Sequence, residues 1–341
     1  MSTAEACCAV SPMALIVLIF TGGTISMRHD VAAGGAVPAL SGKEILDATR
    51  GIEQVARVEI EEFGSYPGPH MTVERMWALR GCIAQHLARP DVSGVVVTHG
   101  TDSLEESAYL VARSLPADKP VVFTGAMKTA SDLGWDGPAN LLDAARVASS
   151  AEARGYGVMV TMLGRVFAGV DVIKAHTHLL DAFESPGLGP VGVVDDGEVI
   201  FRRALPALPP PLAPVTPALP VDIIYSWAGA DSRLLDASRA TARGVVLAAM
   251  GRGNVPPAMV PGVERWVGEG KPVVIASRVQ RGRVGLTYGY PGGARRLHDA
   301  GAILARGRRP QQARIDLMLA LGLGMGGAEL HAMFEGWRGI H

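Results

Sequence analysis

Threonine side chains follow two apolar runs of this chain, each at the point where the run gives way to a loop. The run at 14–20 is followed by TGGT at 21–24, and the run at 94–97 is followed by THGTD at 98–102. Short apolar runs of this kind are typical of strands that are covered on both faces. A hydroxyl delivered to the edge of a buried sheet in this way predicts hydroxyl-nucleophile chemistry.

The first loop combines a threonine with two glycines. Gly22 and Gly23 remove side-chain bulk ahead of Thr24 and allow positive φ, so the backbone can turn sharply and a small substrate can lie against it. Open backbone amides in such a turn can face a developing negative charge. Glycine and threonine are also common in ordinary turns, so a purely structural role for this loop stays open.

The second loop is expected to lead directly into a helix. The DSLEE stretch at 102–106 places capping side chains three residues before two glutamates, which predicts a capping box. Thr101 and Asp102 then lie at a helix N-terminus, where free N–H groups favour a carboxylate and a transient oxyanion. Asp102 as an N-cap alone is the alternative. Two threonine loops at one carboxyl edge of a parallel sheet favour a functional site.

A threonine hydroxyl is inert at neutral pH until a nearby base takes its proton. A partly buried lysine beside a carboxylate can serve as such a base. Lys174, in AGVDVIKAHT, is the candidate, although its spacing in the sequence does not by itself select it. A plain surface lysine is the alternative. His99 is expected to point into the sheet, and His176 with His178 lacks a third ligand, so no zinc site is predicted.

Length and charge limit the classes of protein. The chain has 341 residues, more than one ordinary core accommodates, so two domains are expected. The net charge of −1 predicts neither nucleic-acid binding nor attachment to an anionic membrane surface. Cys7, Cys8 and Cys82 show no metal-ligand spacing and no disulfide framework, which favours a reducing cytoplasm.

The N-terminus does not resemble a signal peptide. Residues 1–12 contain no Lys or Arg, so they are expected to form a frayed extension, with Met13 as an alternative start to Met1. The apolar run that follows is far too short to cross a membrane, and it is already accounted for as the first strand.

Apolar strand candidates alternate with helical stretches through the first half of the chain. The further strand candidates lie at 57–62, 94–98, 120–124 and 156–162, and the helical stretches at 72–88, 103–115 and 138–150. Strand, helix and strand in repetition predict a parallel α/β sheet.

A proline-rich stretch divides the chain. Residues 206–220 hold seven of the 23 prolines, which predicts an extended linker. Apolar strands resume at 221–227, 244–250 and 271–277. The expected fold is therefore α/β with two α/β domains: a larger N-terminal parallel-sheet domain at 13–205 and a smaller C-terminal α/β domain at 221–341.

Four motifs carry a resemblance to a known family. They are TGGTIS at 21–26, THGTDSLEESAY at 98–109, GAMK at 125–128 with DGPANL at 136–141, and DVIKAHT at 171–177. In order and spacing they resemble the bacterial-type L-asparaginase (asparaginase/glutaminase) family, and the likeness runs from residue 13 to about 325. The resemblance implies hydrolysis of L-asparagine to L-aspartate and ammonia through an acyl-threonine, with no metal and no organic cofactor.

The resemblance also assigns roles to single residues. It implies that Thr24 is the nucleophile, that Thr101 relays a proton to Lys174, and that Asp102 also holds the substrate α-amino group. Ser65 is implied to bind the α-carboxylate. The substrate-binding residues that it implies are Gly23, Ser65, Tyr66, Gly100, Asp102 and Ala126.

The chain departs from the family pattern in three places. The expected lid, VAAGGAVPAL at 31–40, lacks the tyrosine that many members carry, and Tyr66, Tyr288 or Tyr290 are the candidates to replace it. Tyr66 itself stands where glutamine often follows the binding serine. No clear match exists at 285–300 for an acidic residue donated by a neighbouring subunit. These departures leave the preference between asparagine and glutamine open.

The segment GVVLAAMGRGNVP at 244–256 resembles the part of the family that reaches into a neighbour's site, with Asn254 at its turn. A homodimer or homotetramer with a shared active site is therefore expected. Two other functions stay open: an amide-handling subunit of a tRNA-dependent amidotransferase, and a non-catalytic amino-acid-binding homologue.

Overall fold

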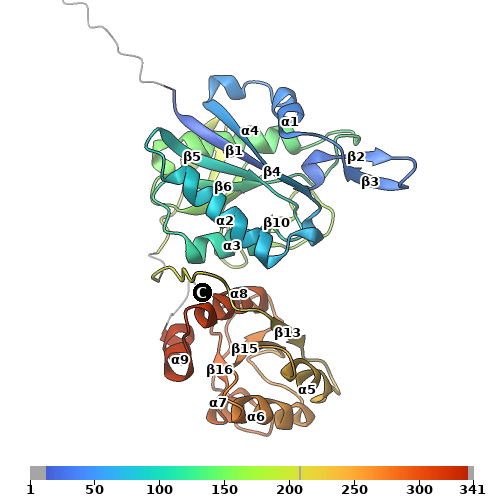
Figure 1. Cartoon of the computed structure of the whole chain (residues 1–341), viewed down its shortest axis with the longest axis vertical. Coiled ribbons are helices and arrows are strands. Elements are labelled where there is room, and N and C mark those ends of the chain that lie inside the picture. The colour runs from blue at the N-terminus through green and yellow to red at the C-terminus, as the bar shows by residue number, and fades with distance from the viewer. Residues whose placement is uncertain (1–12, 207–208, 337–341) are drawn as a thin grey trace, which may run out of the picture.

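The computed structural model describes residues 13–206 and 209–336. The expectations for residues 1–12, including Cys7 and Cys8, lie outside this part of the chain. Two α/β units are stacked along the long axis of the molecule, the larger from the N-terminal half and the smaller from the C-terminal half (Figure 1). Within the described residues, no helix is both long and apolar enough to cross a membrane.

The large unit is built on an eight-stranded sheet with the order β12-β11-β8-β7-β6-β5-β1-β4. The strands are β1 (Leu15–Gly22), β4 (Arg57–Tyr66), β5 (Val92–Thr98), β6 (Val121–Thr124), β7 (Val158–Met162), β8 (Arg165–Ala168), β11 (Gly192–Asp195) and β12 (Glu198–Phe201). The expected strands pair in parallel, whereas β8, β11 and β12 extend the sheet antiparallel. This extension was not predicted, because strands of only four residues, two of them partly exposed, carry a weak apolar signal.

Helices cover both faces of this sheet. They are α1 (Gly42–Ala48), α2 (Val73–Leu87), α3 (Leu104–Ser114) and α4 (Gly137–Ser149). Alternate residues of β1 serve opposite faces: Leu18 belongs to the core shared with α1 and α4, and Val17 to the core shared with α2 and α3. Burial on both faces explains why β1 is apolar without interruption.

The loop where a lid was expected forms a small hairpin. Its strands are β2 (Met27–Asp30) and β3 (Gly35–Pro38). The hairpin is attached to the loop before α4, since the amide of Ala130 donates to the Met27 carbonyl at 2.9 Å. Its tip is exposed, as shown by Val31, which is fully accessible.

The remaining short elements punctuate the loops. They are the strand pair β9 (Ile173–Lys174) with β10 (Phe183–Glu184) and the 3₁₀ turns Thr24–Ser26, Ile52–Gln54, Gly68–His70, Ala151–Ala153 and Pro257–Met259.

The small unit has a parallel sheet in the order β13-β14-β15-β16. The strands are β13 (Val221–Tyr225), β14 (Gly244–Ala249), β15 (Val273–Ser277) and β16 (Ile303–Leu304), and the helices are α5 (Arg233–Arg239), α6 (Val260–Gly268), α7 (Ala294–Asp299), α8 (Pro310–Gly322) and α9 (Gly327–Gly336). Val246 shares a core with α8 and α9, and Val245 with α5, α6 and α7. The restart of the α/β pattern after the prolines is thereby confirmed.

The proline-rich segment contains no helix or strand in its described part, and it runs between the two units. The amide of Leu212 donates to the Arg113 carbonyl at 2.7 Å, and the amide of Ala218 to the Met318 carbonyl at 2.9 Å. The segment is therefore bonded to α3 of the large unit and to α8 of the small unit, which lie side by side.

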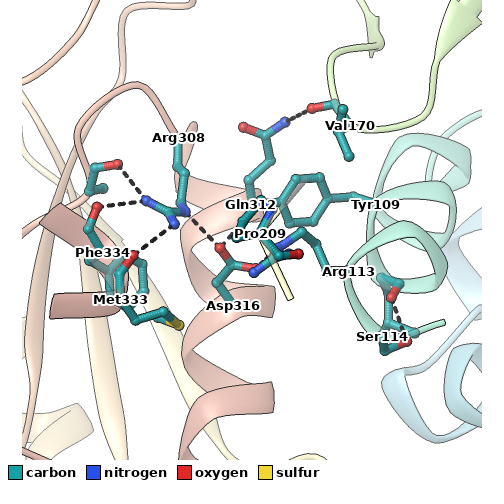
Figure 2. A network of polar contacts seen from close by, with 12 residues as sticks. Tyr109, Arg113, Ser114, Val170, Pro209, Arg308, Gln312, Asp316, Met333 and Phe334 are labelled. Atoms are coloured by element: carbon teal, nitrogen blue, oxygen red, sulfur yellow. Dashed lines mark hydrogen bonds and ion pairs between the residues drawn. The ribbon is translucent and has the colours of Figure 1, made fainter. Parts of the chain in front are cut away.

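A buried ionic network joins α3 to α8, as Figure 2 shows. Asp316, fully buried, accepts hydrogen bonds from Arg113 Nε at 2.9 Å and from Arg308 Nε at 2.6 Å. The Tyr109 hydroxyl donates to the same carboxylate at 3.2 Å. Two guanidinium groups and a hydroxyl share this one buried carboxylate, so the network holds α3 and α8 in one relative position.

Candidate active site

The first threonine loop adopts the sharp turn that its glycines predict. Gly22 and Gly23 have φ of 99° and 85°, and the Gly23 amide donates to the Tyr66 carbonyl at 2.9 Å. Thr24 begins a 3₁₀ turn and is half-buried. Its hydroxyl makes no hydrogen bond within residues 13–206 and 209–336, so it is open to a substrate.

The second loop lies directly against the first. A Cβ atom on Gly23 would lie 2.5 Å from the Gly100 Cα, and one on Gly100 would lie 2.5 Å from the Gly68 Cα. Three backbones therefore meet without intervening side chains. Thr101 is buried and Asp102 is exposed at the end of this loop, so the two side chains face different surroundings.

The predicted capping box is wrong. Ser103 makes no side-chain cap on α3. Its hydroxyl instead donates to the Gly68 carbonyl at 2.6 Å. The hydroxyl therefore ties the second loop to the segment that follows β4. Loop-to-loop contact has taken the donor that the local pattern assigned to the helix.

Lys174 projects from β9 onto this loop. Its Nζ lies 2.9 Å from Thr101 Oγ1 and 2.6 Å from Asp102 Oδ1. Its side chain is 16% exposed, so it is not a plain surface lysine. Its amide donates to Glu105 Oε2 at 2.6 Å, and burial raises the pKa of that carboxyl. An amine that contacts both a hydroxyl and a carboxylate can exchange a proton with the first and be oriented by the second.

His99 has the structural role that the sequence predicts. Its ring is fully buried, and Nδ1 donates to the Gly100 carbonyl at 2.9 Å, since a carbonyl can only accept. Nε2 lies 2.8 Å from Ser107 Oγ and therefore accepts a hydrogen bond from that hydroxyl. Burial lowers the His99 pKa to about 4, so the ring is neutral at physiological pH.

The loop that contains Ala126 is held from below by α4. Asp136 accepts the Met127 amide at 3.1 and 3.0 Å, and Asn140 Nδ2 donates to the Gly125 carbonyl at 3.0 Å. Ala126 is fully buried. The DGPANL motif was predicted only as part of the family resemblance, without this structural role. A polar pair four residues apart, just after a glycine-led loop, is the signal that points to it.

The same loop also approaches the relay. A Cβ atom on Gly125 would lie 3.4 Å from the Thr101 methyl carbon. The structure therefore brings Gly23, Gly100, Thr101, Lys174 and the Ala126 loop to one edge of the large sheet. The Lys174 contacts join the exposed carboxylate of Asp102 to this group.

Ser65 and Tyr66 end β4 at that edge. Ser65 is exposed, and the Tyr66 carbonyl holds the Gly23 amide. The Tyr66 ring packs under the Arg75 guanidinium at 4.2 Å from the ring centroid. Tyr288 and Tyr290 pair with each other at 5.5 Å in the small unit, where both are exposed. No described contact assigns any of the three to the place of the missing lid tyrosine.

The histidines His176 and His178 have a local role. The Nδ1 atom of His176 accepts the amides of His178 and Leu179, each at 3.0 Å. His176 therefore caps its own turn. Among the described residues, the cluster whose geometry could hold a metal ion is His298, His331 and Glu335, in the small unit, outside this site.

Comparisons with known proteins give one family. The family model "Asparaginase, N-terminal" matches residues 15–207, and "Glutaminase/Asparaginase C-terminal domain" matches 220–334. A probable L-asparaginase of Deinococcus radiodurans is 38% identical, over 94% of this chain and 96% of that protein. A glutaminase-asparaginase of Pseudomonas fluorescens biotype A is 31% identical, over 94% of this chain and 90% of that protein.

The fold has a solved counterpart as well. The crystal structure of a probable cytoplasmic L-asparaginase from Campylobacter jejuni superposes with a TM-score of 0.84 at 29% identity. The match covers 94% of this chain and 99% of that one. The likeness therefore extends over both α/β units and the segment between them.

Proposed function

The chain belongs to the asparaginase family, and from this we propose that it hydrolyses the side-chain amide of L-asparagine to L-aspartate and ammonia. The contact of Lys174 Nζ with both Thr101 Oγ1 and Asp102 Oδ1 carries the proposal. It supplies the proton relay that a hydroxyl nucleophile requires. L-Glutamine is the proposed secondary substrate, in keeping with the glutaminase-asparaginase among the relatives.

Thr24 is proposed as the nucleophile. Its Oγ1 forms a bond to the amide carbon, and the bond from that carbon to nitrogen breaks to release ammonia. The half-buried, unpaired hydroxyl at the end of β1 supports this role, and the glycines before it let the substrate approach the backbone. Backbone N–H groups of the two loops stabilise the oxyanion.

Thr101 and Lys174 are proposed to move the protons. Lys174 acts in its unprotonated amine form: it takes the Thr24 proton through the Thr101 hydroxyl, along the 2.9 Å contact, and the proton then passes to the departing nitrogen, which leaves as ammonia. The Thr101 hydroxyl can also orient the water that hydrolyses the acyl-threonine. Asp102 fixes Lys174 through the 2.6 Å ion pair. Because its side chain is 57% exposed, the Asp102 carboxylate also has room for the substrate α-amino group.

The α-carboxylate of the substrate is proposed to bind Ser65, which is exposed at the end of β4. The backbones of Gly23, Gly100 and Ala126, with Tyr66, complete the binding site. The backbones of Gly23, Gly100 and Gly68 pack directly against one another at this site. A small amino-acid amide fits this site better than a larger one.

Peptide mapping tests the assignment of the nucleophile. If Thr24 is acylated and Thr101 assists deacylation, Thr101→Val mixed with asparagine accumulates an acyl adduct on the peptide that contains Thr24. Thr24→Ala should be folded, inactive and free of adduct. An adduct on the Thr101 peptide of Thr24→Ala would assign the attack to Thr101, which already contacts Lys174.

We further propose a homodimer or homotetramer whose active sites are shared between subunits. Large apolar side chains are exposed where the strands of the small unit end, as expected of a face that another copy covers. They are Tyr225, Trp227, Val279, Tyr288 and Tyr290, each 39–52% exposed. The turn at Asn254 is rigid, since its Oδ1 accepts the Ala294 amide at 3.3 Å.

The two other functions considered are not favoured by the relatives, which are asparaginases and glutaminase-asparaginases. A non-catalytic binding protein has no need of the Lys174 relay. Cytoplasmic localisation stays a prediction from cysteine usage.

A further inference from the structure

The segment that leads to Lys174 is bonded to the small unit of the same chain. Gln312 Nε2 donates to the Val170 carbonyl at 2.7 Å, a contact visible in Figure 2. Arg309 Nη2 donates to the carbonyls of Asp171 and Val172 at 3.1 and 3.3 Å. Three consecutive carbonyls, just before β9 begins, are therefore held by side chains from the start of α8.

These contacts are shielded from water. Arg309 and Gln312 are each 7% exposed, and Val172 is 1% exposed. Hydrogen bonds from a charged donor in such surroundings are stronger than exposed neutral ones, and losing a donor leaves a buried carbonyl unsatisfied. The backbone of 170–172 has little freedom to shift while both donors are in place.

The Arg309 charge also acts on Glu105, the carboxylate that binds the backbone amide of Lys174. Burial raises the pKa of Glu105, and the Arg309 charge opposes that rise; Glu105 accepts a hydrogen bond from the Lys174 amide at 2.6 Å. The carboxylate that binds the backbone of Lys174 is thus stabilised by the guanidinium that binds the preceding carbonyls. The lysine is held on both sides by groups that depend on Arg309.

Helix α8 has a defined position relative to α3. Gln312 Oε1 accepts the Arg309 amide at 3.0 Å, which orders the first turn of α8. One turn later Asp316 binds Arg113 of α3 at 2.9 Å. Because α3 starts directly after the Thr101 loop, α8 is the common support of both partners of the relay.

We propose that Gln312 and Arg309 are positioning residues for the Lys174 relay, so that the small unit of each chain sets the contact between Lys174 and Thr101 in its own large unit. This rests on the proposed function, in which Lys174 moves the proton. It adds a dependence on the chain's own small unit to whatever a neighbouring subunit contributes. Misplacement of a reacting group by about 1 Å costs on the order of 100-fold in rate.

Gln312→Glu is the decisive variant. It keeps a side-chain oxygen for the Arg309 amide but directs a carboxylate oxygen, in place of a donor, at the Val170 carbonyl. Gln311→Glu is the matched control. It makes the same charge change one position earlier, at a side chain without hydrogen bonds in the described part of the chain. Gln312→Met removes the donor without adding charge.

We expect Gln312→Glu and Gln312→Met to lower kcat for asparagine about 10-fold or more, with KM within about two-fold of wild type, because the binding loops are unchanged. The pH profile of kcat should shift, since the lysine has moved relative to its partners. Gln311→Glu should match wild type in kcat, in KM and in the pH profile. Melting temperatures establish that each variant is folded.

Three outcomes would overturn the positioning role: wild-type kcat and pH profile in a folded Gln312 variant, a lower melting temperature without a change in kcat, or unfolding of both Gln312 variants. Lys174→Met separates the two proposals. If that variant is inactive while the Gln312 variants are normal, only the positioning role fails. If Lys174→Met keeps full turnover, the proposed relay itself fails.

Discussion

Gly23 and Gly100 meet backbone to backbone: a Cβ atom on Gly23 would lie 2.5 Å from both the Cα and the amide nitrogen of Gly100. The two glycines belong to the loops that present Thr24 and Thr101. Their contact places the loop of the proposed nucleophile directly against the loop of the proposed relay hydroxyl, and no side chain separates the two glycines.

Gly23→Ala should therefore both destabilise the protein and reduce its activity. Gly23 has φ 85° and ψ −177°, a region that only glycine adopts readily, and this strain alone costs on the order of 1–3 kcal/mol. The contact with Gly100 adds to it. Gly51→Ala is the reference for a glycine with positive φ in open space; its φ of 86° and ψ of −2° lie in the left-handed region, where alanine is strained less. Denaturant unfolding should show a larger loss of unfolding free energy for Gly23→Ala than for Gly51→Ala. An equal loss would show that the contact with Gly100 adds no cost.

Lys174→Met and Asp102→Asn should fail in different ways. The first keeps the apolar stem of the lysine and removes its amine, so kcat should fall by about 100-fold or more with KM little changed. Asp102→Asn should also raise KM, because this carboxylate is proposed to hold the α-amino group. Steady-state ammonia release from asparagine measures both. An unchanged KM in Asp102→Asn would remove Asp102 from the binding site.

The buried neutral ring of His99 should make the protein less stable in acid. An unfolded histidine binds a proton below about pH 6.5, whereas folded His99 does so only near a pKa of about 4. The unfolded state therefore binds more protons in this window, so the stability present above pH 6.5 is lost as the pH falls toward 4. The loss from this group approaches about 3 kcal/mol.

His99→Gln, which cannot be protonated, isolates this contribution. As the pH falls from 7 to 4, the unfolding free energy of wild type should fall relative to that of the variant. Urea titrations at several pH values provide the measurement. If the unfolding free energies of the two proteins depended on pH in the same way, His99 would not be the source of the acid destabilisation.

Asp316→Asn should weaken the junction between the two units. It leaves the Arg113 and Arg308 guanidinium groups, each 1% exposed, without their shared carboxylate. Loss of one partner from a buried ionic group costs on the order of 3–5 kcal/mol. Asp47→Asn breaks an exposed pair with Lys43, so it should cost at most about 1 kcal/mol. If denaturant unfolding showed equal losses of unfolding free energy for Asp316→Asn and Asp47→Asn, burial would not be what makes the Asp316 network important.

Dilution should reduce specific activity if active sites are shared. A lasting assembly buries more than about 1,000 Å², and activity per chain should fall below its dissociation constant. Light scattering combined with activity measured over a dilution series tests this. A fully active monomer would refute the shared site while leaving the threonine chemistry untouched.

The strands and helices around the site could be predicted from the sequence, because each carries its own signal. Complete burial makes β1 an unbroken apolar run, and the alternation with helical periodicity identifies the parallel order. The site residues beside strand ends could be named for the same reason. Glycines and threonines after an apolar run mark a loop at the carboxyl edge of a sheet. The antiparallel strands β8, β11 and β12 left no such signal.

Only the tertiary structure decided which side chains meet. Nothing in the spacing of Lys174 singles it out, and the resemblance alone pointed to it, because its partners Thr101 and Asp102 lie on another element. Ser103 looked like a helix cap by local pattern, yet a competing carbonyl, that of Gly68, takes its hydroxyl. The hydrogen bond from Gln312 to Val170 is one of several contacts that join the two α/β units, and the local sequence around neither residue indicates it. Such contacts depend on the placement of whole layers, and that placement is set by the packing of many side chains at once.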